Sequence, residues 1–259
     1  MVGESGRVLS DKAAQKPKDH CTRSTFSSFS HFHTPSVCVL RLPPSAAPDD
    51  QTASPMAAPT APPPPKTVLR VAAISGSLRR ASANTGLIRA AAEICRESIP
   101  GLQIDHVDIS ELPLLNTDLE AGGGFPPAVE AFRDKVSSAD CFLFASPEYN
   151  YSISGPLKNA LDWGSRPPNC WADRAAAMLS ASGSTGGSRS QYHIRQVGVF
   201  LDIHFINKPE VFTKAHLPPK KFDADGNLID SETKEQVRNM LLSLQEFSLR
   251  LQGKSEQGN

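Results

Sequence analysis

The sequence predicts an α/β protein with a doubly wound, five-stranded parallel sheet in residues 67–259 and a disordered tail in residues 1–66. Two observations support this division. After residue 67, short apolar or β-branched segments alternate with segments whose apolar residues recur at helical spacing. Before it lie eleven of the 22 prolines and almost no periodic apolar pattern. Such a tail buries too little surface to offset the entropy lost on ordering.

The tail allows more than one interpretation. Residues 20–48 are rich in Ser and Thr, carry Arg23 and Arg41, and contain no acidic residue, which is typical of an organelle transit peptide. The acidic residues near the start of the chain argue against import. Met56 also stands where a shorter chain would naturally begin. We therefore expect a dispensable tail and a cytoplasmic protein, with organelle import by the tail as the alternative.

The apolar pattern in the first half of the domain predicts three strands and two helices. The first strand is β-branched, and the third is a continuous apolar run of the kind found in strands covered on both faces. Leu87, Ala91 and Cys95 mark the first helix face, and Val129, Phe132 and Val136 mark the second. The expected strands are residues 68–74, 102–109 and 141–146, and the first helix ends near residue 98.

The second half continues the alternation. Pro156 suits the first turn of a third helix. Residues 175–182 predict a fourth strand, 190–200 a fourth helix and 203–206 a weak fifth strand. A hydrophilic connection then leads to a final helix. Five such units in under 200 residues favour the flavodoxin-like strand order 2-1-3-4-5, in which the ligand crevice lies beside the first and third strands.

Composition excludes several classes of function. The formal net charge is zero, so the chain has no general attraction for nucleic acid, and no apolar run reaches the roughly 18 residues of a membrane span. The five cysteines are scattered and never form CxxC, which indicates reduced thiols. We expect no metal site, because the histidines lack ligand spacing. The sequence also lacks the GxSxG motif of many hydrolases.

The loop after the first strand ends where a helix begins, and unpaired amide groups at such a place favour an anion. It is neither GxGxxG nor a Walker A loop. The hydroxyl, amide and guanidinium groups in it suit one terminal phosphate: they belong to Ser77, Arg79, Ser82 and Asn84. Ordinary helix capping by Ser82 or Asn84 is the structural alternative.

The loops after the third and fourth strands should reach the same edge of the sheet. The first of them, residues 146–154, would present backbone groups and two tyrosines to a flat polar ligand, unless Tyr149 or Tyr151 covers the core. The second contains Gly183, Gly186 and Gly187, which would allow a ligand to approach the main chain. A flexible linker is the alternative for this glycine-rich loop.

Together, "GSLRRASAN", "SPEYNYSISGPLKNALDW" and "SGSTGG" resemble the signature stretches of the NADPH-dependent FMN reductase family, in particular its plant NADPH:quinone oxidoreductases. The resemblance implies a flavodoxin-like fold, bound FMN, NADPH or NADH as hydride donor, and ping-pong reduction of quinones to hydroquinones in detoxification. It also implies a homodimer or homotetramer. Because FMN carries the redox chemistry, no catalytic side chain is expected.

The resemblance also assigns cofactor-binding residues by position. Those expected to hold the FMN phosphate are Ser77, Arg79, Ser82 and Asn84. Those expected along the edge of the isoalloxazine ring are Pro147, Glu148, Tyr149 and Asn150, with Ser182 and Gly183 at its other end. Two functional alternatives stay open: an NADPH-dependent reductase of free FMN, azo compounds or metal ions, and a non-enzymatic flavin-binding redox-sensing protein. The nearly neutral domain argues against an electron carrier, which would present an acidic face.

Overall fold

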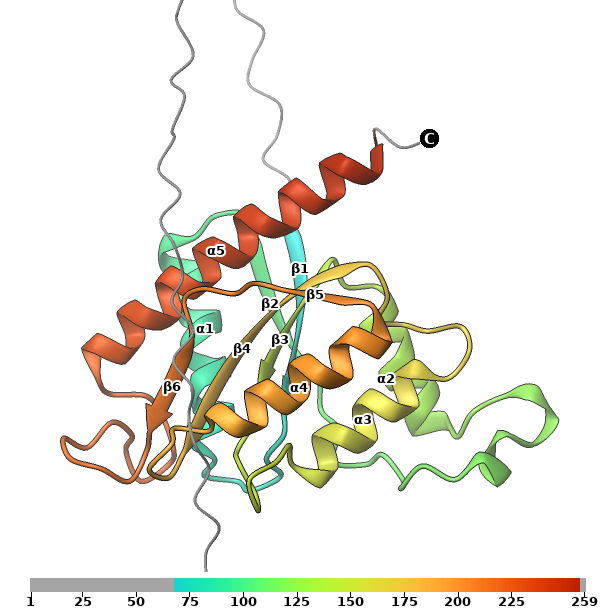
Figure 1. Cartoon of the computed structure of the whole chain (residues 1–259), viewed down its shortest axis with the longest axis horizontal. Coiled ribbons are helices and arrows are strands. Elements are labelled where there is room, and N and C mark those ends of the chain that lie inside the picture. Colours follow the sequence, from blue (N-terminus) through green and yellow to red (C-terminus); the bar gives the residue numbers. More distant parts are fainter. Residues whose placement is uncertain (1–67, 257–259) are drawn as a thin grey trace, which may run out of the picture. The chain divides into compact units, whose positions relative to one another are not determined.

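The structure, a computed structural model, describes residues 68–256. The predicted tail, residues 1–66, lies outside the described part. Within it, one parallel sheet is covered on both faces by helices (Figure 1). The strands are β1 (Leu69–Ser75), β2 (Leu102–His106), β3 (Cys141–Ala145), β4 (Arg174–Ser182), β5 (Ile203–Phe205) and β6 (Val211–Lys214).

The predicted strand order is confirmed, because the sheet runs β2-β1-β3-β4-β5 with every pair parallel. The third neighbour of β4, the strand β6, was not predicted. β6 lies within the expected hydrophilic connection, yet it pairs in parallel with β4 at residues 179–182, beyond the β5 pairing at residues 174–176. The segment after β6 is thereby brought to the carboxyl ends of the other strands.

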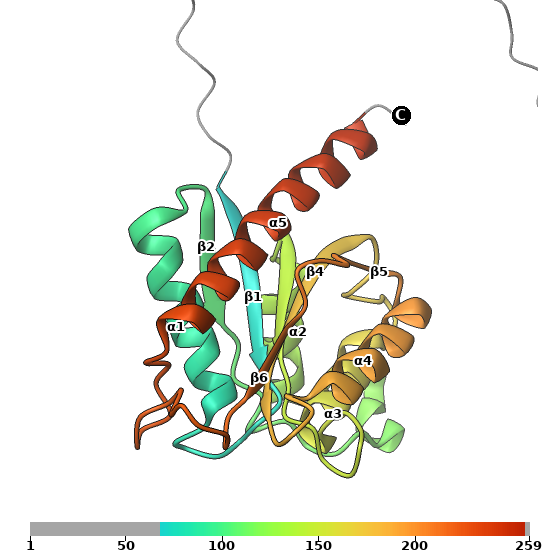
Figure 2. The same ribbon diagram turned by 60° about the vertical axis from the view of Figure 1, so that its left-hand side comes forward.

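The helices form two layers (Figure 2). On one face, α1 and α5 pack over the sheet through Leu87, Val237 and Leu241, all of them completely buried or nearly so. On the other face lie α2, α3 and α4. The bounds are α1 (Ala83–Ser98), the 3₁₀ helix η1 (Thr117–Gly123), α2 (Pro127–Ser137), α3 (Gly155–Ser165), α4 (Ser188–Leu201) and α5 (Ser231–Glu256).

Two tryptophans anchor the layer of α2, α3 and α4. Trp163 and Trp171 are fully buried, and the Trp171 ring lies 5.0 Å from the ring of Phe142 in an edge-on arrangement. A Cβ on Gly164 would approach the Trp171 ring to 2.5 Å, so α3 packs against this tryptophan only because residue 164 has no side chain.

The described cysteines are buried. Cys95 and Cys141 lie in the core, as their apolar faces predict. Burial raises the pKa of the Cys95 thiol to about 11 and that of Cys141 to about 12, so neither forms a reactive thiolate at neutral pH. Cys170, which lies in a loop, is buried as well, because it packs beside Trp171 and is only 6% exposed.

Candidate functional site

The loops that follow β1, β3 and β4 meet at the carboxyl end of the sheet and enclose a cavity of about 260 Å³. We call it the rim cavity. Seven of the ten site residues expected from the sequence line it: Ser77, Arg79, Ser82, Asn84, Pro147, Tyr149 and Ser182. The other three, Glu148, Asn150 and Gly183, belong to the same loops but do not line this cavity.

The start of α1 supplies hydrogen-bond donors to the rim cavity. Ser82 is the N-cap, and its Oγ accepts a hydrogen bond from the backbone N–H of Thr85 at 3.3 Å. The first N–H groups of a helix have no partner within the helix, and the helix dipole makes this end positive. Arg79 has no ion pair within residues 68–256. Capping and anion binding are therefore compatible at this helix start.

Asn84 has a structural role that the sequence did not predict. Its Oδ1 accepts from the Ala181 N–H and its Nδ2 donates to the Ala181 carbonyl, both at 2.9 Å. The side chain, 3% exposed, thus pairs with the β4 backbone as another strand would. This pair joins α1 to β4 and leaves one amide N–H of Asn84 for a ligand.

A tight hairpin forms the tip of the loop after β3. Tyr149 and Ser152 exchange two backbone hydrogen bonds of 3.1 and 3.0 Å, and Asn150 and Tyr151 between them have positive φ angles of 49° and 64°. This is the geometry of a type I′ turn. Tyr149 is 53% exposed and Tyr151 is 68% exposed, so the alternative that either tyrosine covers the core is wrong.

Glu148 does not line the rim cavity, and its carboxylate binds groups of the loop after β4 and of α4. Its Oε2 accepts hydrogen bonds from Thr185 Oγ1 at 2.9 Å and the Arg189 backbone N–H at 3.1 Å, while Arg189 Nη1 donates to Oε1. Burial raises the pKa of Glu148, but these hydrogen bonds outweigh burial and hold the pKa below its usual value. The carboxylate therefore stays charged and links the loop after β3 to the start of α4.

The glycines of the loop after β4 have different reasons for being glycine. Gly186 and Gly187 have φ angles of 64° and 91°, and a Cβ on Gly187 would lie 2.6 Å from the Cβ of Ser180. The fold of the protein itself therefore requires glycine at both positions. A Cβ on Gly183 would meet no atom within 4 Å. The loop is ordered by these contacts, in contrast to the flexible linker considered above, and Gly183 leaves its surface open.

Buried serines hold the three loops in place. Ser154 Oγ donates to the Gly76 carbonyl at 2.7 Å, Ser190 Oγ donates to Ser146 Oγ at 2.8 Å, and Ser180 Oγ donates to the Gly186 carbonyl at 2.6 Å. All three donors are completely buried. Since buried hydrogen bonds of this kind fix loop geometry, the walls of the rim cavity are formed before any ligand binds.

Some of the lining could not be expected from the sequence. Ala215 and His216 reach the rim cavity because β6 pairs with β4, and that strand was not predicted. The sequence signal for the strand is the run of β-branched and aromatic residues at the start of β6, Val211, Phe212 and Thr213. His216 is exposed at the surface and lies at the wall of the cavity.

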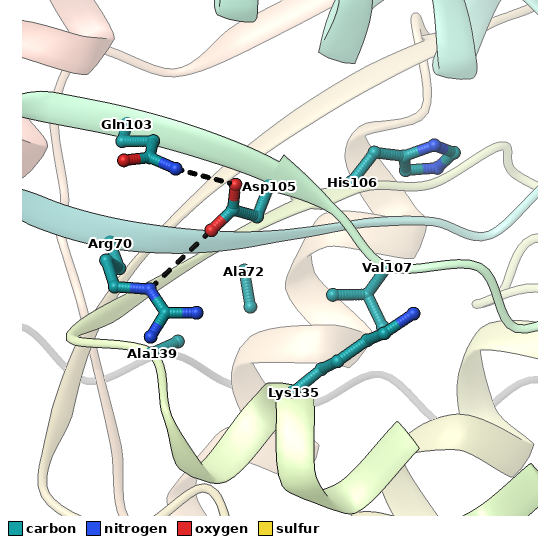
Figure 3. A pocket seen from close by; sticks show the side chains of 8 residues that line it. All are labelled: Arg70, Ala72, Gln103, Asp105, His106, Val107, Lys135 and Ala139. Carbon is teal, nitrogen blue, oxygen red and sulfur yellow. Dashed lines mark hydrogen bonds and ion pairs between the residues drawn. The ribbon is translucent and has the colours of Figure 1, made fainter. Parts of the chain in front are cut away.

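A different cavity, of about 340 Å³, lies between the β1–β2 edge and α2 (Figure 3). Arg70 there pairs with Asp105 at 3.7 Å, and none of the expected site residues lines it.

Within residues 68–256, no group of three or more His, Cys, Asp or Glu side chains is placed to hold a metal ion. In the same part of the chain, no helix is long and apolar enough to cross a bilayer.

Comparison with known proteins decides the family. Residues 69–216, which contain all three loops, match the sequence profile described as NADPH-dependent FMN reductase. The chain belongs to the NADPH-dependent FMN reductase family. The sequence resemblance is therefore confirmed.

The match to relatives in this family covers most of the length of each relative. The chain is 83% identical over 186 residues to "Probable NADPH:quinone oxidoreductase 2" of Oryza sativa subsp. japonica, which covers 72% of this chain and 92% of the rice protein. It is 65% identical over 189 residues to "NADPH:quinone oxidoreductase" of Arabidopsis thaliana, covering 73% and 96%. Among solved structures, FerB, a flavoenzyme NAD(P)H:(acceptor) oxidoreductase of Paracoccus denitrificans, matches with a TM-score of 0.62 at 27% identity, covering 71% and 98%.

Proposed function

We propose that this protein is an FMN-dependent NAD(P)H:quinone oxidoreductase that reduces quinones to hydroquinones. One observation carries the proposal: a preformed cavity at the carboxyl edge of the sheet combines a phosphate-binding set of donors with an open backbone rim. The family assignment and the names of the rice and Arabidopsis relatives support it. When bound, FMN supplies two-electron redox chemistry that amino-acid side chains lack.

The groups at the start of α1 fit the phosphate of FMN. Ser77 and Ser82 offer hydroxyl groups, Arg79 offers an unpaired guanidinium, and the helix start adds unpaired N–H groups. A monophosphate carries close to two negative charges at neutral pH, and such an anion is well matched by one guanidinium and several neutral donors. Asn84 positions the start of α1 and has one N–H left for the same anion.

The rim formed by the other two loops fits a flat polar ring. Pro147 and Tyr149 border the rim cavity on one side and Ser182 on the other. Gly183 has open space where a side chain would stand, so a flat ring meets no obstacle there. The role of Glu148 in this proposal is to hold the rim through Arg189, and Asn150 shapes the turn at its tip.

The chain supplies orientation and electrostatics to the reaction. Backbone N–H groups along the rim stabilise negative charge that develops on reduction, and no ionisable catalytic side chain is required. The exposed Tyr149 and Tyr151 border the open side, where the nicotinamide and the quinone bind in turn. Because the nicotinamide and the quinone use the same binding site in turn, we expect ping-pong kinetics with parallel double-reciprocal plots.

We further propose a cytoplasmic homodimer or homotetramer that acts in detoxification. Cys95, Cys141 and Cys170, the cysteines of the described part of the chain, are buried and free, which suits a reducing compartment. Val199 and Phe200 at the end of α4 are 83% and 89% exposed, and large apolar side chains this exposed are typical of contact surfaces between subunits.

One assay on the purified full-length protein tests the proposed function. Absorbance near the flavin bands reports bound FMN, and NADPH consumption is then followed with and without a benzoquinone. We expect a yellow protein and quinone-dependent NADPH oxidation. A protein that does not bind added FMN would refute the proposal, and an FMN-bearing protein without turnover would favour the redox-sensing alternative.

A further inference from the structure

A second cavity lies on the other side of the loop after β1. It measures about 420 Å³ and shares Ser77 and Arg79 with the rim cavity. Arg80, His106 and Ser110 also line it, so we call it the arginine pocket. Its volume lies within the range of small-molecule and cofactor sites. A molecule in the rim cavity and a molecule in the arginine pocket would therefore contact the same loop.

Two guanidinium groups in the arginine pocket have no partner within residues 68–256. Arg79 and Arg80 are both exposed and form neither an ion pair nor a side-chain hydrogen bond. Arg89 on the following helix α1, in contrast, donates to Asn227 and to the Asp225 carbonyl. Adjacent unpaired arginines repel each other, and an anion between them relieves that repulsion.

The other ionisable groups of the arginine pocket leave a positive balance. Burial lowers the pKa of His106, and the nearby Arg89 lowers it too, against the opposite effect of Asp108. His106 is therefore neutral at pH 7. Asp108 is the one acidic residue of this lining, and its carboxylate already accepts two hydrogen bonds of 2.9 Å from Ser110. Arg79 and Arg80 thus face one carboxylate that is already hydrogen-bonded, and with Arg79 assigned to the FMN phosphate, Arg80 is the charge left for a second anion.

The arginine pocket also has an apolar wall. Leu78 is 56% exposed, and beside it lie Val107 and Ile109, which are 2% and 5% exposed. An exposed leucine next to a guanidinium suits the face of a flat heterocyclic base. Anion-binding arginines, hydroxyl groups and an apolar wall are together the recognition elements of a phosphorylated nucleoside.

We propose that the arginine pocket binds the 2′-phosphorylated adenosine of NADPH, and that Arg80 is the residue that selects NADPH over NADH. This inference rests on the proposed function, in which the nicotinamide binds at the rim cavity. The two cavities share a wall, so a dinucleotide that reaches both crosses the loop at Ser77 and Arg79. Arg79 is assigned to the FMN phosphate, which leaves Arg80 for the 2′-phosphate.

Two probes that differ only in the 2′-phosphate test this assignment: adenosine 2′,5′-bisphosphate and adenosine 5′-monophosphate. Their dissociation constants are measured by calorimetry on the full-length protein, with and without added FMN. We expect the unmodified chain to bind the bisphosphate about tenfold more tightly or better, as a charge-assisted hydrogen bond allows. In Arg80→Ala the ratio of the two constants should fall toward one, and Arg80→Lys should retain part of it.

Arg96→Ala is the matched control, because Arg96 is an exposed arginine on α1 outside both cavities. It should keep the full preference for the bisphosphate. Equal affinity of the unmodified chain for the two probes would overturn the inference. So would an equal loss in Arg80→Ala and Arg96→Ala, which would indicate only a general charge effect.

The same experiment separates this inference from the proposed function. Probe binding requires no turnover, and the flavin absorbance of each variant reports FMN content independently. A protein that discriminates the probes but never binds FMN would support the arginine pocket and refute the proposed function. A yellow, active protein that does not discriminate them would leave the proposed function standing and refute the role of Arg80.

Discussion

Arg189 Nη1 donates a 2.9 Å hydrogen bond to Oε1 of Glu148, whose side chain is only 7% exposed. This pair joins the loop after β3 to the start of α4. Its strength depends on the charge of Glu148, and the hydrogen bonds to this carboxylate keep its pKa below the usual value of 4.5 despite the opposing effect of burial.

We therefore predict a pH-dependent effect of Glu148→Gln on stability. A carboxyl group whose pKa is lower in the folded state stabilises the fold above its unfolded pKa, and this contribution is lost as pH falls through the folded pKa. At pH 7 the variant should lose about 1 kcal/mol of unfolding free energy, because Arg189 is partly exposed. Urea unfolding between pH 7 and pH 3.5 should show this difference shrinking below pH 4.5. Glu97→Gln, at an exposed residue of α1, is the control, and a difference independent of pH would contradict the prediction.

Asn84→Ala should destabilise the fold by about 2 kcal/mol or more. The change removes both partners of the Ala181 backbone and leaves a buried N–H and a buried carbonyl unsatisfied, at about 1–3 kcal/mol each. Chemical denaturation at pH 7 measures the loss. Asn239→Ala on the exposed side of α5 should stay within about 0.5 kcal/mol. Equal effects at the two positions would mean that the Asn84 pair contributes little.

The substitution Gly187→Ala should lower stability, whereas Gly183→Ala should weaken FMN binding. Gly187→Ala places a Cβ at positive φ and 2.6 Å from Ser180, so the variant should lose about 2 kcal/mol of stability. Gly183→Ala meets no protein atom, so the unfolding free energy without FMN should change by less than about 0.5 kcal/mol. The FMN dissociation constant should nevertheless rise, as flavin fluorescence titration would show. Unchanged FMN affinity in Gly183→Ala would place the ring elsewhere.

Arg79→Ala should weaken FMN binding by at least about tenfold, since it removes the unpaired guanidinium from the rim cavity. Titration of the flavin-free protein with FMN measures this effect. The change in the dissociation constant should exceed the change in kcat measured with NADH at saturating FMN. The opposite ranking would mean that the phosphate is bound by other residues.

The strand order was predictable because the alternation of apolar segments is local in the sequence. β6 was not, since four residues carry little periodic signal and its partner in β4 lies about thirty residues earlier. The same limit applies within the site. The motifs placed seven residues at the rim cavity, but the contacts of Asn84 with Ala181 and of Glu148 with Arg189 join positions far apart in the chain. Only folding shows whether such side chains face a ligand or another loop.

The Tyr149–Ser152 hairpin closes through its own backbone, and its side chains contribute nothing to the buried cores. The identity of residues 149 and 151 can therefore change while the turn keeps its shape, although Tyr151 would then lose its stacking contact with Arg189 at 3.9 Å. A library randomised at these two positions should retain folded members in large numbers. This small tip is where laboratory evolution can broaden or narrow the choice of electron acceptor with little damage to the scaffold.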